Sequence, residues 1–434
     1  MKLNRQNFAA AKAPERIVHV GIGAFAKAHQ IWFTHKVDLA NEWGVVAFTG
    51  RSAKAAELLN EQDGLYTLIE RAPGGDSFEV ISKIVRAADG LDISDFTQTL
   101  TKPEIAIVTL TITEAGYGFT RDGKLDLENP APAINRLAFA LDMRRRDNGN
   151  PIALVSCDNI PNNGELLRDA IRNVFSTFDD AAQEWLEQNV SFVSTSIDRI
   201  TPQTVNADIE EVMKETGWQD NSATVTEPFK DWILSGKFPM GRPAWENAGA
   251  RFVDEIEPYE KRKLWLLNGA HSILAYSGLI RGHATVAEAI ADEECKSLVE
   301  SFWNDAVKHL PEAELQLPEY REALMQRFSN PRIAHQLRQI AKDGATKLAV
   351  RIAPIALAEL EAGRKAEVEA LTIAAWVGHL KNSEFEDSQN AAIRLALASS
   401  DPTKSLVALL DARLAQSAEF VYSVEQHAES LFFA

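Results

Sequence analysis

The most informative part of the sequence is an apolar, helix-like segment at residues 260–271 that carries three spaced polar side chains. These are Lys263, Asn268 and His271, at spacings of five and three residues. Oxidising an alcohol requires a base for the hydroxyl proton, and a lysine can serve when burial or positive neighbours lower its pKa. An asparagine amide stabilises negative charge developing on oxygen, and a histidine orients a hydroxyl. The segment therefore predicts the chemistry of alcohol oxidation.

The spacing of these three residues leaves a second interpretation open. On an ideal α-helix Asn268 and His271 are neighbours, whereas Lys263 and Asn268 are separated by roughly 140° of arc. One cavity can receive all three side chains only if the helix presents a broad face to it. In the second interpretation Lys263 is exposed, Asn268 caps a turn and His271 is an ordinary core residue.

Polar clusters also follow three predicted strands, at 109–117, 156–164 and 198–202. Sites in α/β enzymes lie at the carboxyl ends of strands, so these clusters are candidate site loops, and we assign Thr111 to a cofactor site. In the alternative interpretation they are turns and helix caps, with Asp198 and Arg199 forming a structural ion pair.

A glycine motif begins the chain's first α/β unit. Gly21, Gly23 and Ala26 fit the pattern G-x-G-x-x-A between a short apolar run and a helical stretch. The first glycine permits a tight turn, the second lets the backbone approach a pyrophosphate, and the small third residue lets helix and strand pack closely. The motif predicts a bound dinucleotide, and the alternative is an ordinary glycine turn.

The end of the second predicted strand bears on which dinucleotide binds. An acidic residue there would bind the ribose 2′-hydroxyl, but the sequence reads Thr49-Gly50-Arg51-Ser52. Arg51 and Ser52 suit a 2′-phosphate instead, which predicts tolerance of or preference for NADP(H) over NAD(H). Alternatively, Arg51 only covers the adenine or faces solvent.

Short β-branched runs alternate with helical patterns through the first half of the chain. The runs are 16–21, 45–49, 105–111, 152–156 and 190–196, with helical stretches following from about Ala24 and Ala53. This alternation predicts a parallel sheet covered on both faces. From Glu260 onward the pattern is rich in alanine and leucine and helical. Prolines and a glycine at 238–243 place the expected domain boundary between residues 242 and 243.

The composition is that of a globular protein with room for two domains: 434 residues, 45% hydrophobic and 25% charged. A net charge of -17, from 62 acidic and 45 basic side chains, disfavours a nucleic-acid or anionic-membrane surface. Two cysteines, Cys157 and Cys295, show no pairing pattern, and no stretch has the apolar length of a signal peptide or a membrane span. We therefore expect a cytoplasmic protein that acts on a small molecule, as a monomer or small homo-oligomer.

Together these segments resemble the long-chain mannitol dehydrogenase family, which includes mannitol 2-dehydrogenases, arabinitol dehydrogenases, and fructuronate and tagaturonate reductases. The likeness runs from the glycine motif at 21–30 to Lys347. The segment discussed first fits the family's K-x4-N-x2-H motif. The stretch 190–202 fits the signature around a V-D-R triplet, except that Ile197 replaces the valine.

The resemblance implies a Rossmann-type dinucleotide-binding domain with a parallel sheet at 1–242 and a mostly α-helical substrate domain at 243–434. It implies catalysis without a metal ion, with Lys263 as general base and NAD or NADP as cofactor. The other implied roles are oxyanion stabilisation by Asn159 and Asn268, substrate contacts from His271, Asp198 and Lys347, and a proton path to solvent at Glu260.

The substrate branch of the family is left open by the sequence. In the polyol branch an arginine lies eight positions before the substrate-contacting lysine, but here that position is Gln339. The stretches 330–335 and 339–351 look more like the uronate-reductase branch, in which a substrate carboxylate needs a cationic partner such as Lys347 or Arg351. The expected reaction is therefore of the mannitol/fructose or the mannonate/fructuronate type.

Two competing classes remain to be tested. A zinc-dependent alcohol dehydrogenase would need clustered Cys, His and carboxylate ligands, and the two cysteines and scattered histidines do not suggest them. A non-catalytic NAD(P)H sensor of the same fold would have no need of a base, an amide pair and a histidine at the nicotinamide.

Overall fold

The computed structural model describes residues 1–50, 52–120, 124–311 and 315–433 of the chain. The chain divides into two compact units, Met1–Glu257 and Pro258–Ala434. Each unit has its own architecture, and each carries part of the expected site.

The first unit is built on an eight-stranded sheet in the order β11-β10-β8-β7-β6-β1-β2-β5. The strands from β8 to β5 are parallel, β10 is antiparallel to β8, and β11 is parallel to β10. This arrangement confirms the predicted Rossmann-type sheet, with an antiparallel addition at one edge. The strands are β1 (Glu15–Val20), β2 (Gly44–Phe48), β5 (Ile84–Ala88), β6 (Ile107–Leu110), β7 (Ile152–Ser156), β8 (Val190–Asp198), β10 (Asp231–Ser235) and β11 (Arg251–Phe252).

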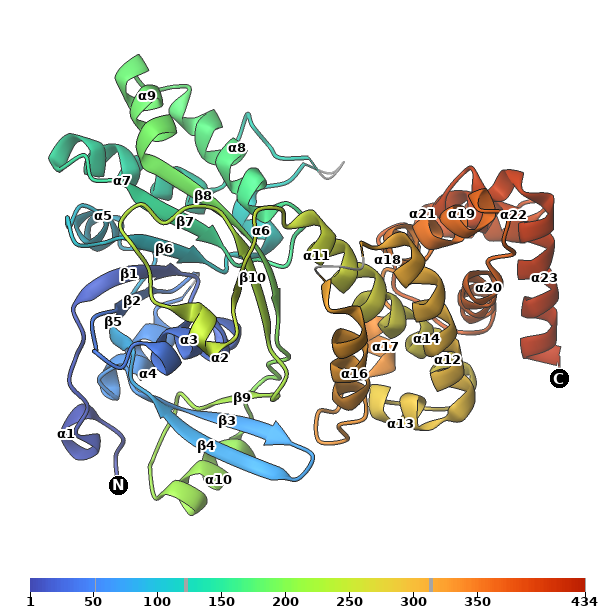
Figure 1. Ribbon diagram of the computed structural model, residues 1–434, viewed down its shortest axis with the longest axis horizontal. Coiled ribbons are helices and arrows are strands. Elements are labelled where there is room, and N and C mark those ends of the chain that lie inside the picture. The colour runs from blue at the N-terminus through green and yellow to red at the C-terminus, as the bar shows by residue number, and fades with distance from the viewer. Residues whose placement is uncertain (51, 121–123, 312–314, 434) are drawn as a thin grey trace. The chain divides into compact units, whose positions relative to one another are not determined.

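Helices cover both faces of this sheet, as Figure 1 shows. Side chains alternate along each strand: Val18 and Val46 pack under α5, α7, α8 and α9, whereas Ile17 and Val45 pack under α2, α3 and α4. Burial on both faces explains why these strands read as continuous apolar runs. The helices of the unit are α1 (Arg5–Phe8), α2 (Ala24–Ala28), α3 (Gln30–Val37), α4 (Lys54–Glu61), α5 (Ile93–Leu100), α6 (Thr113–Tyr117), α7 (Pro132–Asp147), α8 (Asn163–Phe175), α9 (Asp180–Asn189), α10 (Asn206–Thr216) and the 3₁₀ turn η1 (Trp245–Ala248).

A second, three-stranded sheet was not expected from the sequence. It has the order β4-β3-β9 and consists of β3 (Tyr66–Ala72), β4 (Gly75–Ile81) and β9 (Thr224–Thr226). The hairpin of β3 and β4 is only partly buried along β4, so its residues lack the apolar runs that mark the central strands. Its edge strand β9 comes from far along the chain, which no local pattern can indicate.

The boundary between the units lies at Glu257/Pro258, which corrects the position expected between residues 242 and 243. The segment after 243 belongs to the first unit because β11 adds to the sheet beside β10. Trp245 is fully buried, with its ring centroid 4.7 Å from that of Trp232 in β10. The proline- and glycine-rich stretch is therefore a loop within the first unit.

The second unit is helical throughout its described residues, as predicted. Its two central helices, α12 and α20, are apolar on nearly all sides, which is the pattern of helices buried in a core. No helix of the described chain has the length and apolar character needed to cross a membrane. The elements are α11 (Glu257–Arg262), the π-helix η2 (Lys263–Gly269), α12 (Ala270–Ile280), α13 (Val286–Ala291), α14 (Glu293–Ala306), η3 (Val307–His309), α16 (Leu317–Phe328), α17 (Leu337–Ile340), α18 (Gly344–Arg351), α19 (Ala353–Glu361), α20 (Glu367–Asn382), α21 (Asn390–Leu397), α22 (Pro402–Leu410), η4 (Leu414–Gln416) and α23 (Ala418–Phe433).

Candidate functional site

The glycine motif forms the turn between β1 and α2. Gly21 has a φ of +94°, and a β-carbon there would lie 2.2 Å from the carbonyl oxygen of Thr111, so only glycine fits. The Thr111 hydroxyl donates to the Gly21 carbonyl oxygen at 2.9 Å and so holds the turn. Gly23 is different: a β-carbon there would come no closer than 3.9 Å to another atom, so the protein itself does not require a glycine. Ala26 is fully buried, as close packing of helix on strand demands.

A pocket of about 720 Å³ lies beside this turn. It is lined by residues that follow β1, β2, β5 and β6 and by the first turn and a half of α7, among them Gly50, Leu91 and Arg136. Pockets that hold small-molecule cofactors have volumes in roughly this range, about 300–1,000 Å³. The open space at Gly23, the pocket's position at the carboxyl ends of parallel strands and its volume fit a dinucleotide.

The residues expected to set the cofactor preference are only partly visible. Ser52 is exposed, and its hydroxyl accepts a hydrogen bond from the backbone N–H of Lys54 at 3.3 Å, at the start of α4. Arg51 lies outside the described residues. Thr49 is buried and donates through its hydroxyl to Asp89 at 3.3 Å. The NADP hypothesis for Arg51 and Ser52 therefore stays a prediction.

Two of the polar clusters that follow strands are joined by one buried carboxylate. Asp158, after β7, accepts hydrogen bonds from the Thr113 backbone N–H at 2.7 Å and from the Tyr117 hydroxyl at 2.9 Å. Burial raises the pKa of Asp158, and it raises the pKa of Tyr117 as well. Thr113 has a φ of +61°, which is strained for a β-branched residue, and it lines the pocket. Strain of this kind persists where the surroundings hold it, often at ligand sites.

Asn159 follows this carboxylate and is exposed in the first unit. The loop that carries it is fixed by Asn163, whose buried amide donates to the Asp158 carbonyl and to the Thr195 carbonyl, both at 2.8 Å. The Asn163 side-chain oxygen accepts from the Thr195 backbone N–H at 2.9 Å. The sequence did not single out Asn163, yet it ties the loop bearing Asn159 to β8.

Asp198 is the last residue of β8 and is half-buried. Its neighbour Arg199 is buried and donates to the Ala28 carbonyl at 2.6 Å and to the Glu70 carboxylate at 2.8 Å. Arg199 therefore links α2 to β3, and its ion pair is with Glu70, whereas the alternative interpretation of the sequence paired it with Asp198.

In the second unit, the segment with Lys263, Asn268 and His271 begins with a π-helix, Lys263–Gly269, rather than a regular α-helix. A π-helix repeats its hydrogen bonds from residue i to i+5, so residues five apart occupy similar angular positions. Lys263 and Asn268 are five apart, and the wide angle expected for an α-helix therefore does not apply. His271 follows on the next turn, in α12.

Side chains from neighbouring helices bind the carbonyl groups of this π-helix. The Trp303 indole N–H donates to the Leu266 carbonyl oxygen at 2.7 Å, in the core. The Arg351 guanidinium donates to the Asn268 carbonyl oxygen and to the Ser272 hydroxyl, each at 3.2 Å. These contacts hold the irregular turn in place, which is consistent with the frequent occurrence of π-bulges at functional sites.

His271 is buried against two aromatic rings. Its ring centroid lies 5.0 Å from that of Phe328 and 5.0 Å from that of His335, the latter edge to face. The pKa of His271 lies well below its usual value because burial disfavours the charged form, and the positive potential from the nearby Arg327, Arg351 and Lys347 acts in the same direction. His271 is therefore neutral near pH 7, in a state to donate or accept a hydrogen bond.

The remaining expected residues lie on two short helices of this unit. Lys347 and Arg351 are one turn apart on α18, and the Lys347 ammonium donates to the Ile340 carbonyl at 3.1 Å. Burial lowers the pKa of Lys347, with Arg351 as a second cause, and burial lowers that of Arg351 to about 10. Glu260 is half-buried in α11, three residues before Lys263.

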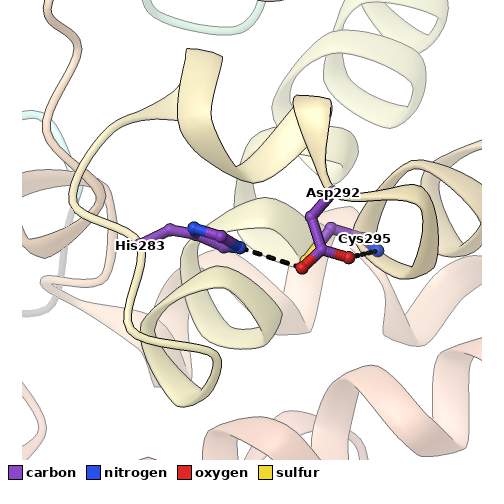
Figure 2. A group of neighbouring side chains, drawn as sticks. All are labelled: His283, Asp292 and Cys295. Atoms are coloured by element: carbon purple, nitrogen blue, oxygen red, sulfur yellow. Dashed lines mark hydrogen bonds and ion pairs between the residues drawn. The ribbon is translucent and has the colours of Figure 1, made fainter.

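One group of side chains in the second unit has the composition of a metal site (Figure 2). His283, Asp292 and Cys295 bring one ligand atom each within 4.8 Å of one another. The Asp292 carboxylate accepts from His283 at 3.0 Å and from Arg281 at 2.7 Å, and it caps the N-terminus of α14. A guanidinium at that distance opposes a divalent cation, so the geometry is explained by a capped helix with an ion pair.

Comparison with known proteins gives consistent matches to both units. Residues 15–247 match the family model of the mannitol dehydrogenase Rossmann domain, and residues 255–432 match that of the mannitol dehydrogenase C-terminal domain. The chain is 32% identical to D-mannonate oxidoreductase of Escherichia coli (strain K12), over 90% of this chain and 84% of that protein. It is 34% identical to polyol:NADP oxidoreductase of Gluconobacter oxydans (strain 621H), over 77% of this chain and 73% of that protein.

A solved structure shows the same similarity. The ternary complex of Pseudomonas fluorescens mannitol 2-dehydrogenase with NAD and D-mannitol matches 99% of this chain and 97% of that chain, with a TM-score of 0.80 and 31% sequence identity. The relatives thus include enzymes named for polyols and for a sugar acid; one is named for NADP, and another was solved in complex with NAD.

Proposed function

The chain belongs to the mannitol dehydrogenase family, and on that premise we propose that it interconverts a secondary alcohol and a ketone on a polyol or sugar acid, with Lys263 as the base. Membership of the family makes the chain an oxidoreductase that uses a nicotinamide cofactor. The base, the absence of a metal in the mechanism and the particular substrate are our proposals.

In the proposed mechanism the protein handles the proton and the charge on oxygen. A bound nicotinamide would supply the hydride acceptor for the carbinol carbon. Lys263, uncharged, takes the hydroxyl proton, and Glu260 passes it toward solvent. Asn159 and Asn268 donate amide hydrogens to the substrate oxygen as negative charge develops on it. Neutral His271 and Asp198 hold the substrate hydroxyls and so fix the reacting carbon.

The observation that carries this proposal is the π-helix that begins at Lys263. Residues five apart lie close in angle around a π-helix, so the spacing of Lys263 and Asn268 suits two groups that act on one substrate oxygen, and contacts from Trp303 and Arg351 hold the turn. An ordinary core helix has no need of such a turn, whereas a base and an oxyanion donor that share one substrate oxygen do. This also argues against a sensor that only binds NAD(P)H.

Replacing Lys263 with methionine tests the proposal. We expect turnover to fall about 100- to 10,000-fold while NADH binding, followed by fluorescence, is unchanged. Lys261→Met, two residues earlier and exposed, is the matched control. In the wild type, alcohol oxidation should fall as Lys263 protonates at low pH, while ketone reduction should persist to lower pH. Undiminished turnover in the Lys263 variant, or loss of wild-type turnover on exhaustive chelation, would sink the mechanism.

Within this function we favour a sugar acid over a neutral polyol. Arg327, Arg351 and Lys347 lie near enough to His271 to lower its pKa, and a substrate carboxylate is the natural partner for such cations. The similarity to a D-mannonate oxidoreductase agrees with this choice. Comparing kcat/KM for mannonate, altronate, mannitol and arabinitol with both cofactors tests it, and a preference for mannitol would reverse it.

We further propose that the protein works in the cytoplasm, and that NADP is tolerated through Arg51 and Ser52. Cys157 and Cys295 are both unpaired and buried, as expected of a chain that folds without disulfides. Comparing the affinities for NADH and NADPH in the wild type and in Arg51→Asp tests the cofactor proposal, and equal affinities in both proteins would end it.

A further inference from the structure

Arg136 in α7 has no assigned task, although it lines the pocket beside the glycine turn. Within the part of the chain that the structure describes, it makes no hydrogen bond and no ion pair, and its Nε atom is buried without a partner. Among the described residues that line the pocket, it is the one charged side chain. An arginine that lines a pocket without an ion pair can offer the face of its guanidinium to a ligand ring.

Aromatic packing fixes where the Arg136 guanidinium lies. Its central carbon is 5.4 Å from the centroid of the Phe96 ring, which is buried in α5. Phe96 in turn meets Phe48, at the end of β2, edge to face, with the centroids 5.0 Å apart. Arg136 is therefore held near the ends of β2 and β5, the part of a Rossmann-type sheet that receives the adenosine half of a dinucleotide.

Leu91, on the loop after β5, is the second unexplained feature of this pocket. It lines the pocket, yet its side chain is 60% exposed. The lining of the pocket also includes the apolar residues Ile112, Ala131 and Pro132. The pocket thus offers an apolar side chain and a planar cation, and each of them can pack against the face of a flat aromatic ring.

We propose that the adenine ring of the cofactor is held between the Leu91 side chain and the Arg136 guanidinium. The inference rests on the proposed use of a nicotinamide dinucleotide. A guanidinium stacks on an aromatic face and loses little hydration in doing so, whereas leucine covers the opposite face. Stacking of this kind does not read the ribose 2′-position, so it serves NAD and NADP alike. The choice between the two cofactors stays with Arg51 and Ser52.

Binding measurements on Arg136→Met test this assignment without any need for turnover. Methionine keeps the length and apolar stem of the side chain but removes the cation. We expect the affinities for NADH, NADPH and ADP-ribose to fall by about tenfold, the order found when base stacking is lost. The affinity for reduced nicotinamide mononucleotide, which has no adenine, should not change. Leu91→Ala should give a smaller loss with the same pattern.

Two controls separate this role from a structural one. Arg146→Met, on the same helix, removes an exposed arginine paired with Asp142 and should leave all four affinities unchanged. Thermal unfolding should show that Arg136→Met is folded, and Arg136→Lys should recover part of the affinity. Unchanged NADH affinity in Arg136→Met, a loss confined to NADPH, or an equal loss for the mononucleotide would each overturn the assignment. A wild type that binds no NADH would instead overturn the proposed cofactor.

Discussion

At the scale of single residues, the two glycines of the dinucleotide motif have separable roles. At Gly21 both the positive φ and the Thr111 carbonyl exclude a side chain, whereas at Gly23 the protein leaves space for one. The sequence motif does not distinguish the two positions. In the structure, the fold itself requires glycine at position 21, whereas the space at position 23 is available to a ligand.

Substituting each glycine with alanine tests this division. Gly21→Ala should lower the free energy of unfolding by at least about 2 kcal/mol, because both the backbone conformation and the close carbonyl must change. Gly23→Ala should unfold like the wild type in a denaturant titration but lose most of its NADH affinity, since the added methyl group occupies space needed by the pyrophosphate. A Gly23→Ala protein that is unstable, or that binds NADH normally, would contradict the division.

Among single residues, the sequence predicts a structural role best where the residue type alone determines that role. Asn163, Trp303 and Arg136 were not foreseen, because an asparagine after a strand, a core tryptophan and a helical arginine are all common. Their importance comes from partners far away in the chain, or from the lack of a partner. No local pattern carries that information.

At the scale of elements, the π-helix η2 is the feature that links the sequence to the chemistry. Its sequence, Lys263–Gly269, has the apolar content of an ordinary helix, so the spacing of five between Lys263 and Asn268 seemed unfavourable. The wider turn is held by side chains from α14 and α18, which are distant in sequence. The strands were predictable because each is marked by a local run of apolar residues. The π-helix was not predictable because it depends on contacts from residues distant in the sequence.

Trp303→Phe should weaken this turn, because phenylalanine fills most of the space of the tryptophan side chain but cannot donate the hydrogen bond. Losing the buried hydrogen bond to the Leu266 carbonyl should cost about 1–3 kcal/mol of stability and, by misplacing Lys263, roughly 10- to 100-fold in kcat. Trp185→Phe removes a similar bond, to the Gly149 carbonyl at 3.0 Å, in the first unit. It should lower stability without lowering kcat. If both variants kept full kcat, the turn would have no catalytic role.

Helix α20 provides a pH test of the second unit. Glu369 is fully buried, and neither carboxylate oxygen has a hydrogen-bond partner within the described chain. Burial raises its pKa to about 8, so it is neutral in the folded state below that pH, whereas in the unfolded state it ionises near pH 4.5. The unfolded state therefore holds fewer protons between these values, and stability falls as pH rises from about 4.5 to 8.

Glu369→Gln should remove this dependence. Compared with the wild type, the melting temperature of the variant should be similar at pH 5 and clearly higher at pH 8. Glu384→Gln, at an exposed position just after the same helix, should show no such widening difference. A Glu369→Gln protein whose advantage over the wild type is the same at both pH values would show that Glu369 does not titrate as proposed.

At the scale of the whole molecule, the sequence defined the architecture well and the site only in outline. The Rossmann-type sheet and the helical second unit follow from periodicity, because burial imposes a period of two or near four on side chains. The boundary was misplaced, since β11 joins the first sheet after a stretch that reads as a linker. Motifs indicate the site residues, whereas the contacts that hold them join segments distant in the sequence and have no local pattern.

Charge on this scale yields a prediction about the substrate. The chain carries a net charge of -17, which repels an anionic sugar acid, whereas the cations around His271 attract it. Salt screens charges over a Debye length of about 8 Å at physiological ionic strength. If the local cations dominate, KM for mannonate should rise with salt, while KM for mannitol should stay constant.

Lys347→Met should flatten this salt response, because Lys347 is one of the cations assigned to the carboxylate. Lys342→Met, which removes a surface lysine paired with Glu386 at 2.6 Å, should leave the response as in the wild type. Both variants change the net charge by the same amount. A difference between them in the salt dependence of KM must therefore come from the position of the lost charge and not from the total charge. A KM for mannonate that falls with added salt would mean that the overall negative charge governs, and the carboxylate would then have no cationic site in the second unit.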